Sequence, residues 1–252
     1  MLVLLPPSET KRAGGHGAPL DLSSLSFADL EPLRMQLADE LVALSADEES
    51  ALRALKLGPR LATEVEHNRA LWSSATMPAL DRFTGVLFDA LDAETLDEGA
   101  RAYAAQNVFV HSALFGLVGA MDPIPAYRLS HDSRVPGLPL KRFWRDAIAD
   151  RIAAHDGLII DLRSEAYAEL GPAPVHAASV FVRVVAVDEG GRRRALNHFN
   201  KQAKGRFTRR LLETRPALGS VDELLDWAGS EGFELSAGAP AGRGPAELDL
   251  VA

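Results

Sequence analysis

Short apolar runs and longer stretches with helical spacing alternate irregularly along the whole chain. The runs Leu2–Leu5 and Leu158–Leu162 are too short for helices, and their Leu, Val and Ile content predicts buried strands. Because strands and helices are interleaved, the pattern favours an α+β fold, a single domain around a central mixed sheet with peripheral helices. Further strands are expected at 108–112, 179–187, 193–199 and 233–236, and helices at 27–44, 47–57, 60–72, 95–105, 140–155, 201–213 and 221–227, with a short helix from 165.

Length and composition set the domain organisation. With 252 residues the chain can bury a full core, and residues 1–237 are predicted to form the domain. Residues 238–252 are rich in Ala, Gly and Pro, which predicts a disordered tail. The absence of cysteine excludes disulfides and thiol catalysis, and the N-terminal apolar run is too short for a signal peptide or a membrane span. We therefore expect a cytoplasmic protein without a membrane partner.

A dense cationic segment, NHFNKQAKGRFTRR, runs from Asn197 to Arg210 in a chain of net charge −8. Near-helical spacing allows much of this charge to share one face, which suits phosphate, carboxylate or a nucleic-acid backbone. Gly205 lets a backbone or a ligand approach closely. The alternative is a solvated helix face. Since the field of an acidic protein repels phosphates at long range, any contact with nucleic acid must be local.

Polar clusters follow two of the predicted buried strands. The sequence PPSETK, Pro6 to Lys11, follows the first, and DLRSEAY, Asp161 to Tyr167, includes the end of the second. Ligand sites often occupy the carboxyl ends of strands in sheets flanked by helices. A plain turn is the alternative for PPSETK, which lacks the glycines of a phosphate-binding loop. Capping of the next helix by Ser164 is the alternative for the second cluster.

A third motif, LRALKLGPRLATEV, resembles a helix–hairpin–helix, whose hairpin amides bind a DNA phosphate. Lys56 occupies the place of the first hairpin glycine, and Gly58 and Arg60 follow it. An ordinary corner between two helices explains Gly58-Pro59 equally well. The histidines are scattered, and Glu64 with His67 is a single carboxylate–histidine pair, so the sequence assigns no metal and no cofactor.

Six motifs in order resemble the YaaA family of peroxide-stress proteins: MLVLLPPSETK, FTGVLF, SALFGLVGAMDPIPAYRL, FW, DLRSEAY and HFNKQAKGRFTR. The resemblance implies an α+β domain of unusual topology with a basic cleft and a helix–hairpin–helix element. It also implies a cytoplasmic role in limiting oxidative damage, linked to lower free intracellular iron and to DNA binding. Matched by position, and with Arg206 added from the cationic segment, the residues expected in the cleft are Lys11, Tyr127, Arg128, Ser164, Glu165, Tyr167, Lys201 and Lys204.

This chain departs from the family pattern at several positions, which marks a divergent branch. Gly119-Ala120 stands where many members have Arg-Pro, Phe83 and Phe88 stand where tyrosines are common, and Phe199-Asn200 replaces Tyr-Ala. The lost hydroxyls and the lost arginine change the groups available to a ligand in the cleft.

Two classes of function stay open at this point. One is a protection factor that binds DNA or another phosphate-bearing ligand, with DNA contacts from Lys56, Gly58, Arg60, Arg209 and Arg210. The other is an enzyme acting on a small anionic or nucleotide-like substrate in the same cleft. A scaffold that binds a partner's acidic surface is a third reading. A cleft lysine with a pKa near neutrality would favour the enzyme, whereas permanently charged arginines favour anion binding. We expect the cleft residues to converge on one concave, net-positive site.

Overall fold

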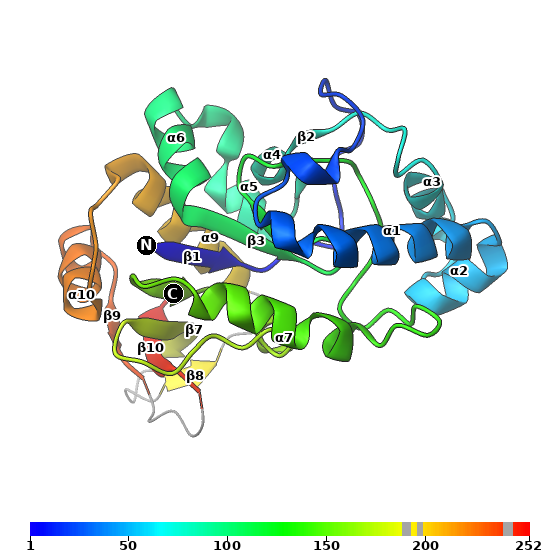
Figure 1. The fold of residues 1–252 in the computed structure, drawn as a ribbon. Helices are drawn as coiled ribbons and strands as arrows, with labels where there is room; N and C mark the ends of the chain where they lie inside the picture. Colours follow the sequence, from blue (N-terminus) through cyan, green and yellow to red (C-terminus); the bar gives the residue numbers. More distant parts are fainter. Residues whose placement is uncertain (188–192, 196–198, 239–243) are drawn as a thin grey trace.

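The computed structural model describes residues 1–187, 193–195, 199–238 and 244–252 (Figure 1). Its centre is an eight-stranded mixed sheet in the order β4-β3-β1-β6-β7-β10-β9, with β8 paired to β7 outside this path. The strands are β1 (Leu2–Leu5), β3 (Val108–Ser112), β4 (Gly116–Gly119), β6 (Ile159–Asp161), β7 (Ser179–Val187), β8 (Arg193–Ala195), β9 (Leu235–Ala237) and β10 (Ala246–Val251). A separate pair is formed by β2 (Met77–Pro78) and β5 (Pro123–Ile124).

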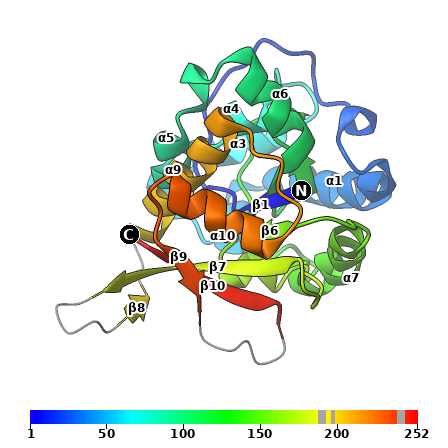
Figure 2. The same ribbon diagram turned by 90° about the vertical axis from the view of Figure 1, so that its left-hand side faces the viewer.

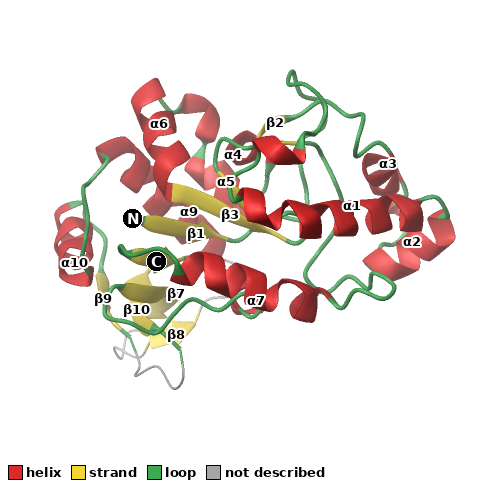
Figure 3. Ribbon diagram, viewed as in Figure 1, coloured by secondary structure: helices red, strands yellow, loops and turns green. Residues whose placement is uncertain are grey.

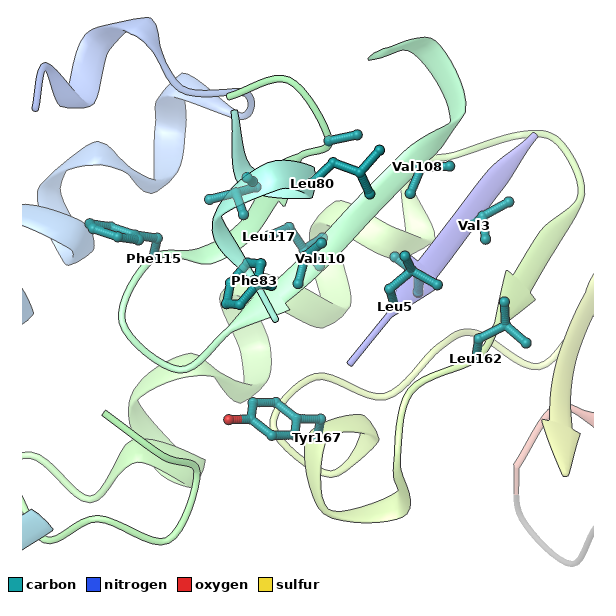
Figure 4. Close-up of a cluster of buried hydrophobic side chains, with 14 of the residues drawn as sticks. Val3, Leu5, Leu80, Phe83, Val108, Val110, Phe115, Leu117, Leu162 and Tyr167 are labelled. Atoms are coloured by element: carbon teal, nitrogen blue, oxygen red, sulfur yellow. The ribbon is translucent and has the colours of Figure 1, made fainter. Parts of the chain in front are cut away.

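Strands β3, β1, β6, β7 and β10 run parallel to one another, and the antiparallel pairs are β3–β4, β7–β8 and β9–β10. All four residues of β1 are buried, as expected for a parallel strand in the middle of a covered sheet. Figure 4 shows the cluster of buried side chains around β1 and β3, with Tyr167 and Phe83 among its members.

Helices cover both faces of the sheet (Figures 1 and 2). The helix α7 (Leu140–Ala153) packs on one face through Trp144, Ile148 and Ile152, which are spaced by four residues and fully buried. The helix α9 (Phe199–Thr214) lies on the other face, beside α5 (Val86–Leu91). The helices are α1 (Glu31–Ser45), α2 (Glu48–Leu55), α3 (Thr63–Arg69), α4 (Ala79–Arg82), α5 (Val86–Leu91), α6 (Glu98–Asn107), α7 (Leu140–Ala153), α8 (Glu165–Ala168), α9 (Phe199–Thr214) and α10 (Val221–Ser230).

The two ends of the molecule are built from different secondary-structure elements (Figures 1 and 3). Helices α1, α2 and α3 gather at one end, to the right in Figure 1, whereas α10, β9 and β10 lie at the opposite end. This separation matters for the site, because residues predicted to act together on DNA come from both ends.

The expected α+β domain with a central mixed sheet is confirmed, and most predicted strands and helices form within a few residues of their expected limits. The predicted β-hairpin forms between β7 and β8, although its turn at 188–191 lies outside the described residues. Its second strand is described over Arg193–Ala195, residues 196–198 lie outside the described residues, and Phe199, expected at the end of this strand, instead begins α9.

Residues 246–251 differ from the predicted disordered tail, because they form β10 inside the central sheet between β7 and β9. Leu248 and Leu250 are buried, and Asp249 between them is buried as well, at 8% exposure. In the sequence the leucines alternate with acidic residues, the period of two that is typical of a strand. The Ala, Gly and Pro residues that precede it dominate the composition and obscure the pattern.

Candidate functional site

The two predicted polar clusters lie at the same edge of the sheet. Strands β1 and β6 are parallel neighbours, with Leu4 beside Asp161, so the segments that follow both strands leave the sheet side by side. The first is the loop 6–11, which we call the first loop. The second leads through Arg163 into α8. Two apolar runs distant in sequence thus bring their polar ends together.

The Lys11 side chain stabilises the first loop through hydrogen bonds to its backbone. Its Nζ donates hydrogen bonds to the carbonyl oxygens of Ser8 at 2.9 Å and Glu9 at 3.1 Å. The same nitrogen lies 4.1 Å from the centre of the Tyr127 ring and 5.4 Å from that of Phe83. Burial, and then the charge of Arg128, lower the pKa of Lys11 to about 7, although Glu64 and Glu9 oppose this shift. A small change near neutral pH therefore alters the charge of this site.

Arg128 lies next to the first loop and is 9% exposed. Its guanidinium pairs with the carboxylate of Glu9 and reaches the Glu9 carbonyl oxygen at 3.3 Å. The backbone N–H of Arg128 donates to Asn68, at 2.7 Å, and this buried asparagine also donates to the Arg128 carbonyl. The carboxylate of Glu9 therefore already pairs with the positive charge of Arg128.

Tyr127 is buried beside Lys11, and Tyr167 is buried close enough to Tyr127 for Tyr127 to influence its ionisation. The Tyr127 hydroxyl shares a hydrogen bond of 2.8 Å with Ser112, and burial raises the pKa of Tyr127. The Tyr167 ring contacts the rings of His111 and His131, with centroid distances of 5.7 Å and 5.2 Å. Burial is also the main cause that raises the pKa of Tyr167, and Tyr127 adds to it. Both phenols stay protonated near neutral pH.

A buried charged network that the sequence analysis missed lies behind Tyr167. Arg163 pairs with Asp161 through Nη2 at 2.6 Å and Nε at 2.8 Å, and neither side chain is more than 2% exposed. Its Nη1 also donates to His111 Nδ1 at 2.9 Å and to the Gly171 carbonyl at 2.9 Å. Because Nδ1 accepts this bond, the proton of neutral His111 resides on Nε2. The signal for this network in the sequence is the spacing of Asp161 and Arg163, an acid and a base two residues apart at the end of a predicted strand.

The side chains of Ser164 and Glu165 are both engaged in contacts within the protein. The Ser164 hydroxyl accepts from the backbone N–H of Tyr167 at 3.4 Å and caps α8, which is the capping alternative. Glu165 pairs with Arg183 at 2.5 Å.

Lys204 is 3% exposed and donates to the Arg163 carbonyl at 3.1 Å. Burial, opposed by Asp161, lowers the pKa of Lys204 to about 8.

Lys201 faces the first loop across an open cavity of about 400 Å³, which we call the first-loop cavity. Hydroxyl groups line one part of its wall, where Thr84 Oγ1 donates to Thr10 Oγ1 at 3.0 Å and Ser8 accepts from the Thr84 backbone at 3.2 Å. Apolar groups from Pro6, Pro7, Val86, Leu87 and Phe88 line the rest, and Gly85 and Glu9 complete it.

Helix α9 divides the cationic segment instead of presenting it on one face. Phe207 and Lys204 are buried, and Arg206 lines a different cavity from Lys201. Arg209 pairs with Asp92 and Glu213, and Arg210 pairs with Glu213 and Glu231. Gly205 is explained by packing, since a Cβ there would lie 2.2 Å from the carbonyl oxygen of Leu87 in α5. The expectation of one shared cationic face is therefore wrong.

The α2–α3 turn has some features of the predicted hairpin. Lys56 adopts the left-handed backbone conformation with φ 56°, the conformation that a glycine would supply. Its amide and that of Leu57 bond back to α2, and its Nζ pairs with Asp132 at 2.7 Å. Gly58 and Arg60 are exposed. This turn lies at the α1–α3 end, whereas Arg210 contacts Glu231 beside α10 at the other end, so the predicted DNA-binding residues are not brought together.

The positions that depart from the family pattern have structural roles. The Gly119 amide donates to Asp122 at 2.8 Å, and a Cβ at Gly119 would lie 2.7 Å from Ser26 Oγ. The Phe83 and Phe88 rings stack with centroids 5.3 Å apart. Phe88 lines the first-loop cavity, while Phe83 lies under Lys11, so the missing tyrosine hydroxyls leave an apolar surface there.

In the part of the chain that the structure describes, no group of three or more His, Asp or Glu side chains is placed to hold a metal ion. No described helix combines the length and the apolar composition needed to cross a membrane.

Sequence comparisons place these residues in a family context. The family model described as peroxide stress protein YaaA matches residues 1–239. A UPF0246 protein of Streptomyces coelicolor is 43% identical over 256 residues, covering 100% of this chain and 98% of the relative. A UPF0246 protein of Corynebacterium glutamicum strain R is 42% identical over 238 residues, covering 92% of this chain and 94% of the relative. A UPF0246 protein of Shewanella piezotolerans is 28% identical over 238 residues, covering 89% and 90%.

Proposed function

We propose a function for this chain from the premise that it belongs to the peroxide stress protein YaaA family. In this proposal it binds a small phosphate-bearing ligand in the first-loop cavity, in the cytoplasm, as part of the response to peroxide. The cellular result would be less free iron and less oxidative damage to DNA. The observation that carries the proposal is the composition of the cavity wall, which combines Lys201, several hydroxyl groups and an apolar surface.

The size and chemistry of the cavity support a ligand with an anionic end and a flat or apolar body. About 400 Å³ falls within the range of small-molecule sites. Lys201 is exposed and has no carboxylate partner among the described residues, so its charge is available to a phosphate. The Thr10 hydroxyl has an O–H that can donate to a phosphate, since the Ser8 and Thr84 hydroxyls already donate to the carbonyl and the hydroxyl of Thr10. Pro6, Pro7 and Phe88 offer an apolar surface. A nucleotide combines these properties.

The hydrogen bonds of Lys11 support anion binding over nucleophilic catalysis. Two carbonyl oxygens and the face of an aromatic ring surround its Nζ, and all three stabilise an ammonium better than a neutral amine. Its lowered pKa favours the enzyme alternative to some degree, because a neutral lysine is a competent base. A bound anion would raise that pKa again and hold the lysine in its charged form.

The proposal is tested by titrating the protein with a fluorescent nucleoside diphosphate and with pyrophosphate. Lys201→Gln should weaken the affinity at least about tenfold, because a charge-assisted hydrogen bond contributes about 1.5–3 kcal/mol. Lys56→Gln, which removes the same charge at the other end of the molecule, should leave the affinity unchanged. Equal affinities for wild type and Lys201→Gln would refute the site. Slow conversion of the bound nucleotide, detected by chromatography, would show that the cavity is the active site of an enzyme.

DNA binding by the α2–α3 turn is the second candidate, favoured by the left-handed backbone of Lys56 followed by exposed Gly58 and Arg60. Affinity for a short duplex should then decrease steeply with salt concentration, and Arg60→Gln should lower the slope of log affinity against log salt by about one unit. No binding at low salt would remove this candidate. The two candidates are distinguishable because Lys201→Gln and Arg60→Gln affect different ligands.

A further inference from the structure

A second cavity, of about 620 Å³, lies on a different side of α9 from the first-loop cavity. Gln202, Ala203 and Arg206 line it from α9, Ala186 lines it from β7, and Phe233 follows α10. Leu250, Val251 and Ala252 at the end of β10 complete its described wall. The cavity therefore exists only because β10 is part of the sheet.

Among the described residues, the wall is apolar except at one place. Leu250 is buried at 1% exposure, and Phe233 belongs to an aromatic cluster with Phe207 and Trp227, at centroid distances of 5.2 Å and 6.2 Å. Arg206 and the amide of Gln202 are the polar side chains on this wall. Such a combination of a rigid apolar surface and few polar groups is typical of small-molecule sites.

Arg206 differs from the other arginines of α9. Arg209 and Arg210 each pair with two carboxylates, whereas no described carboxylate lies within ion-pair distance of exposed Arg206. A guanidinium is always charged near neutral pH and binds carboxylates through two parallel hydrogen bonds. Its free donors lie beside an apolar cavity large enough for a hydrocarbon chain or an aromatic ring.

From these features we propose that the second cavity binds an amphipathic carboxylate, a molecule with an apolar body and one carboxylate group. The body contacts Phe233, Leu250 and Val251, and the carboxylate pairs with Arg206. This site is independent of the first-loop cavity, since Lys201 lines the other one. Each site can therefore fail its test without affecting the other.

Decanoate and its uncharged analogue decanol serve as probes, with binding measured by calorimetry on the full chain. Decanoate should bind at least about fivefold more tightly than decanol, and Arg206→Gln should abolish that difference, because the ion pair is lost. Arg210→Gln, a matched change on the same helix, should leave decanoate binding unchanged. The fluorescence of buried Trp227 should change on binding, since its ring lies 6.2 Å from that of Phe233.

A variant that fills part of the second cavity tests where the apolar body of the ligand binds. Ala203→Phe should weaken both probes, whereas Lys201→Gln should affect neither. Unfolding measured by circular dichroism would show whether Ala203→Phe is folded, and Arg206→Gln, a surface change, keeps the test valid if it is not. Equal binding of decanoate and decanol to wild type, or unchanged decanoate binding to Arg206→Gln, would overturn the proposal.

Discussion

Lys11 shows how one residue combines structural and electrostatic roles. Its hydrogen bonds to the carbonyl oxygens of Ser8 and Glu9 hold the first loop, and both residues also line the first-loop cavity. The lysine charge therefore lies directly behind the cavity wall. Burial and Arg128 lower its pKa to about 7, so the site is only partly charged at neutral pH.

This arrangement predicts that anion affinity decreases as pH rises through about 7. Below that value Lys11 is charged and attracts the ligand, and above it the amine is neutral and contributes no attraction. Lys11→Arg should keep the affinity constant between pH 6 and 9, because arginine stays protonated. A sulfate-bearing probe is used in a calorimetric pH series, since its own charge does not change in this range. A wild-type affinity that is flat with pH would contradict the role given to Lys11.

At the scale of elements, the contact between α5 and α9 requires a residue without a side chain. A Cβ at Gly205 would lie 2.2 Å from the Leu87 carbonyl and 2.8 Å from the Ala90 side chain. Gly205→Ala should therefore destabilise the fold by about 1–3 kcal/mol, despite the better helix propensity of alanine. Urea unfolding measures this change. Gly229→Ala in α10, where the added Cβ meets nothing within 4 Å, is the control and should be neutral or stabilising.

Strand β10 is predicted to contribute to global stability because it is paired on both sides, with β7 and β9. Leu248 is 3% exposed, and its replacement by alanine should lower the free energy of unfolding by about 2–5 kcal/mol. The nearby Glu247 also pairs with Arg183, which holds Glu165 at the start of α8. A disordered tail would instead give no change in the urea midpoint for Leu248→Ala.

The elements differ in how far they could be predicted from sequence. Leu2–Leu5 and 179–187 are apolar runs whose burial is visible in the residues themselves, and Trp144, Ile148 and Ile152 repeat with helical spacing. Strand β10 follows a segment of Ala, Gly and Pro that conceals its alternation. The short helix α5 offers too few residues for a periodic pattern.

The candidate site was only partly predictable for a related reason. The meeting of the first loop with the segment after β6 follows from two parallel strands, each ending in polar residues. The neutralisation of Arg210 by Glu231 joins residues 21 positions apart through the packing of α10, which no local pattern reveals. Likewise, the bond between Arg163 and His111 spans 52 positions.

At the scale of the whole molecule, most described cations are already paired, and the protein carries a net charge of −8. A broad surface for nucleic acid is therefore disfavoured, because phosphates would meet a repulsive field at long range. Among the cations without a described carboxylate partner, Lys201 lines the first-loop cavity and Arg206 lines the second cavity, while exposed Arg60 lies on the α2–α3 turn. We therefore predict small anionic ligands at two separate places.

The most direct test of the first-loop site uses the five lysines of the chain, Lys11, Lys56, Lys141, Lys201 and Lys204, as reporters. With ¹³C at each lysine ε-carbon, NMR spectra are recorded while pyrophosphate is added at pH 7. We predict saturable shifts of the Lys201 and Lys11 signals, while the Lys56 and Lys141 signals do not move. Shifts confined to Lys56, or no saturable shift at Lys201, would contradict the proposal that the first-loop cavity binds phosphate.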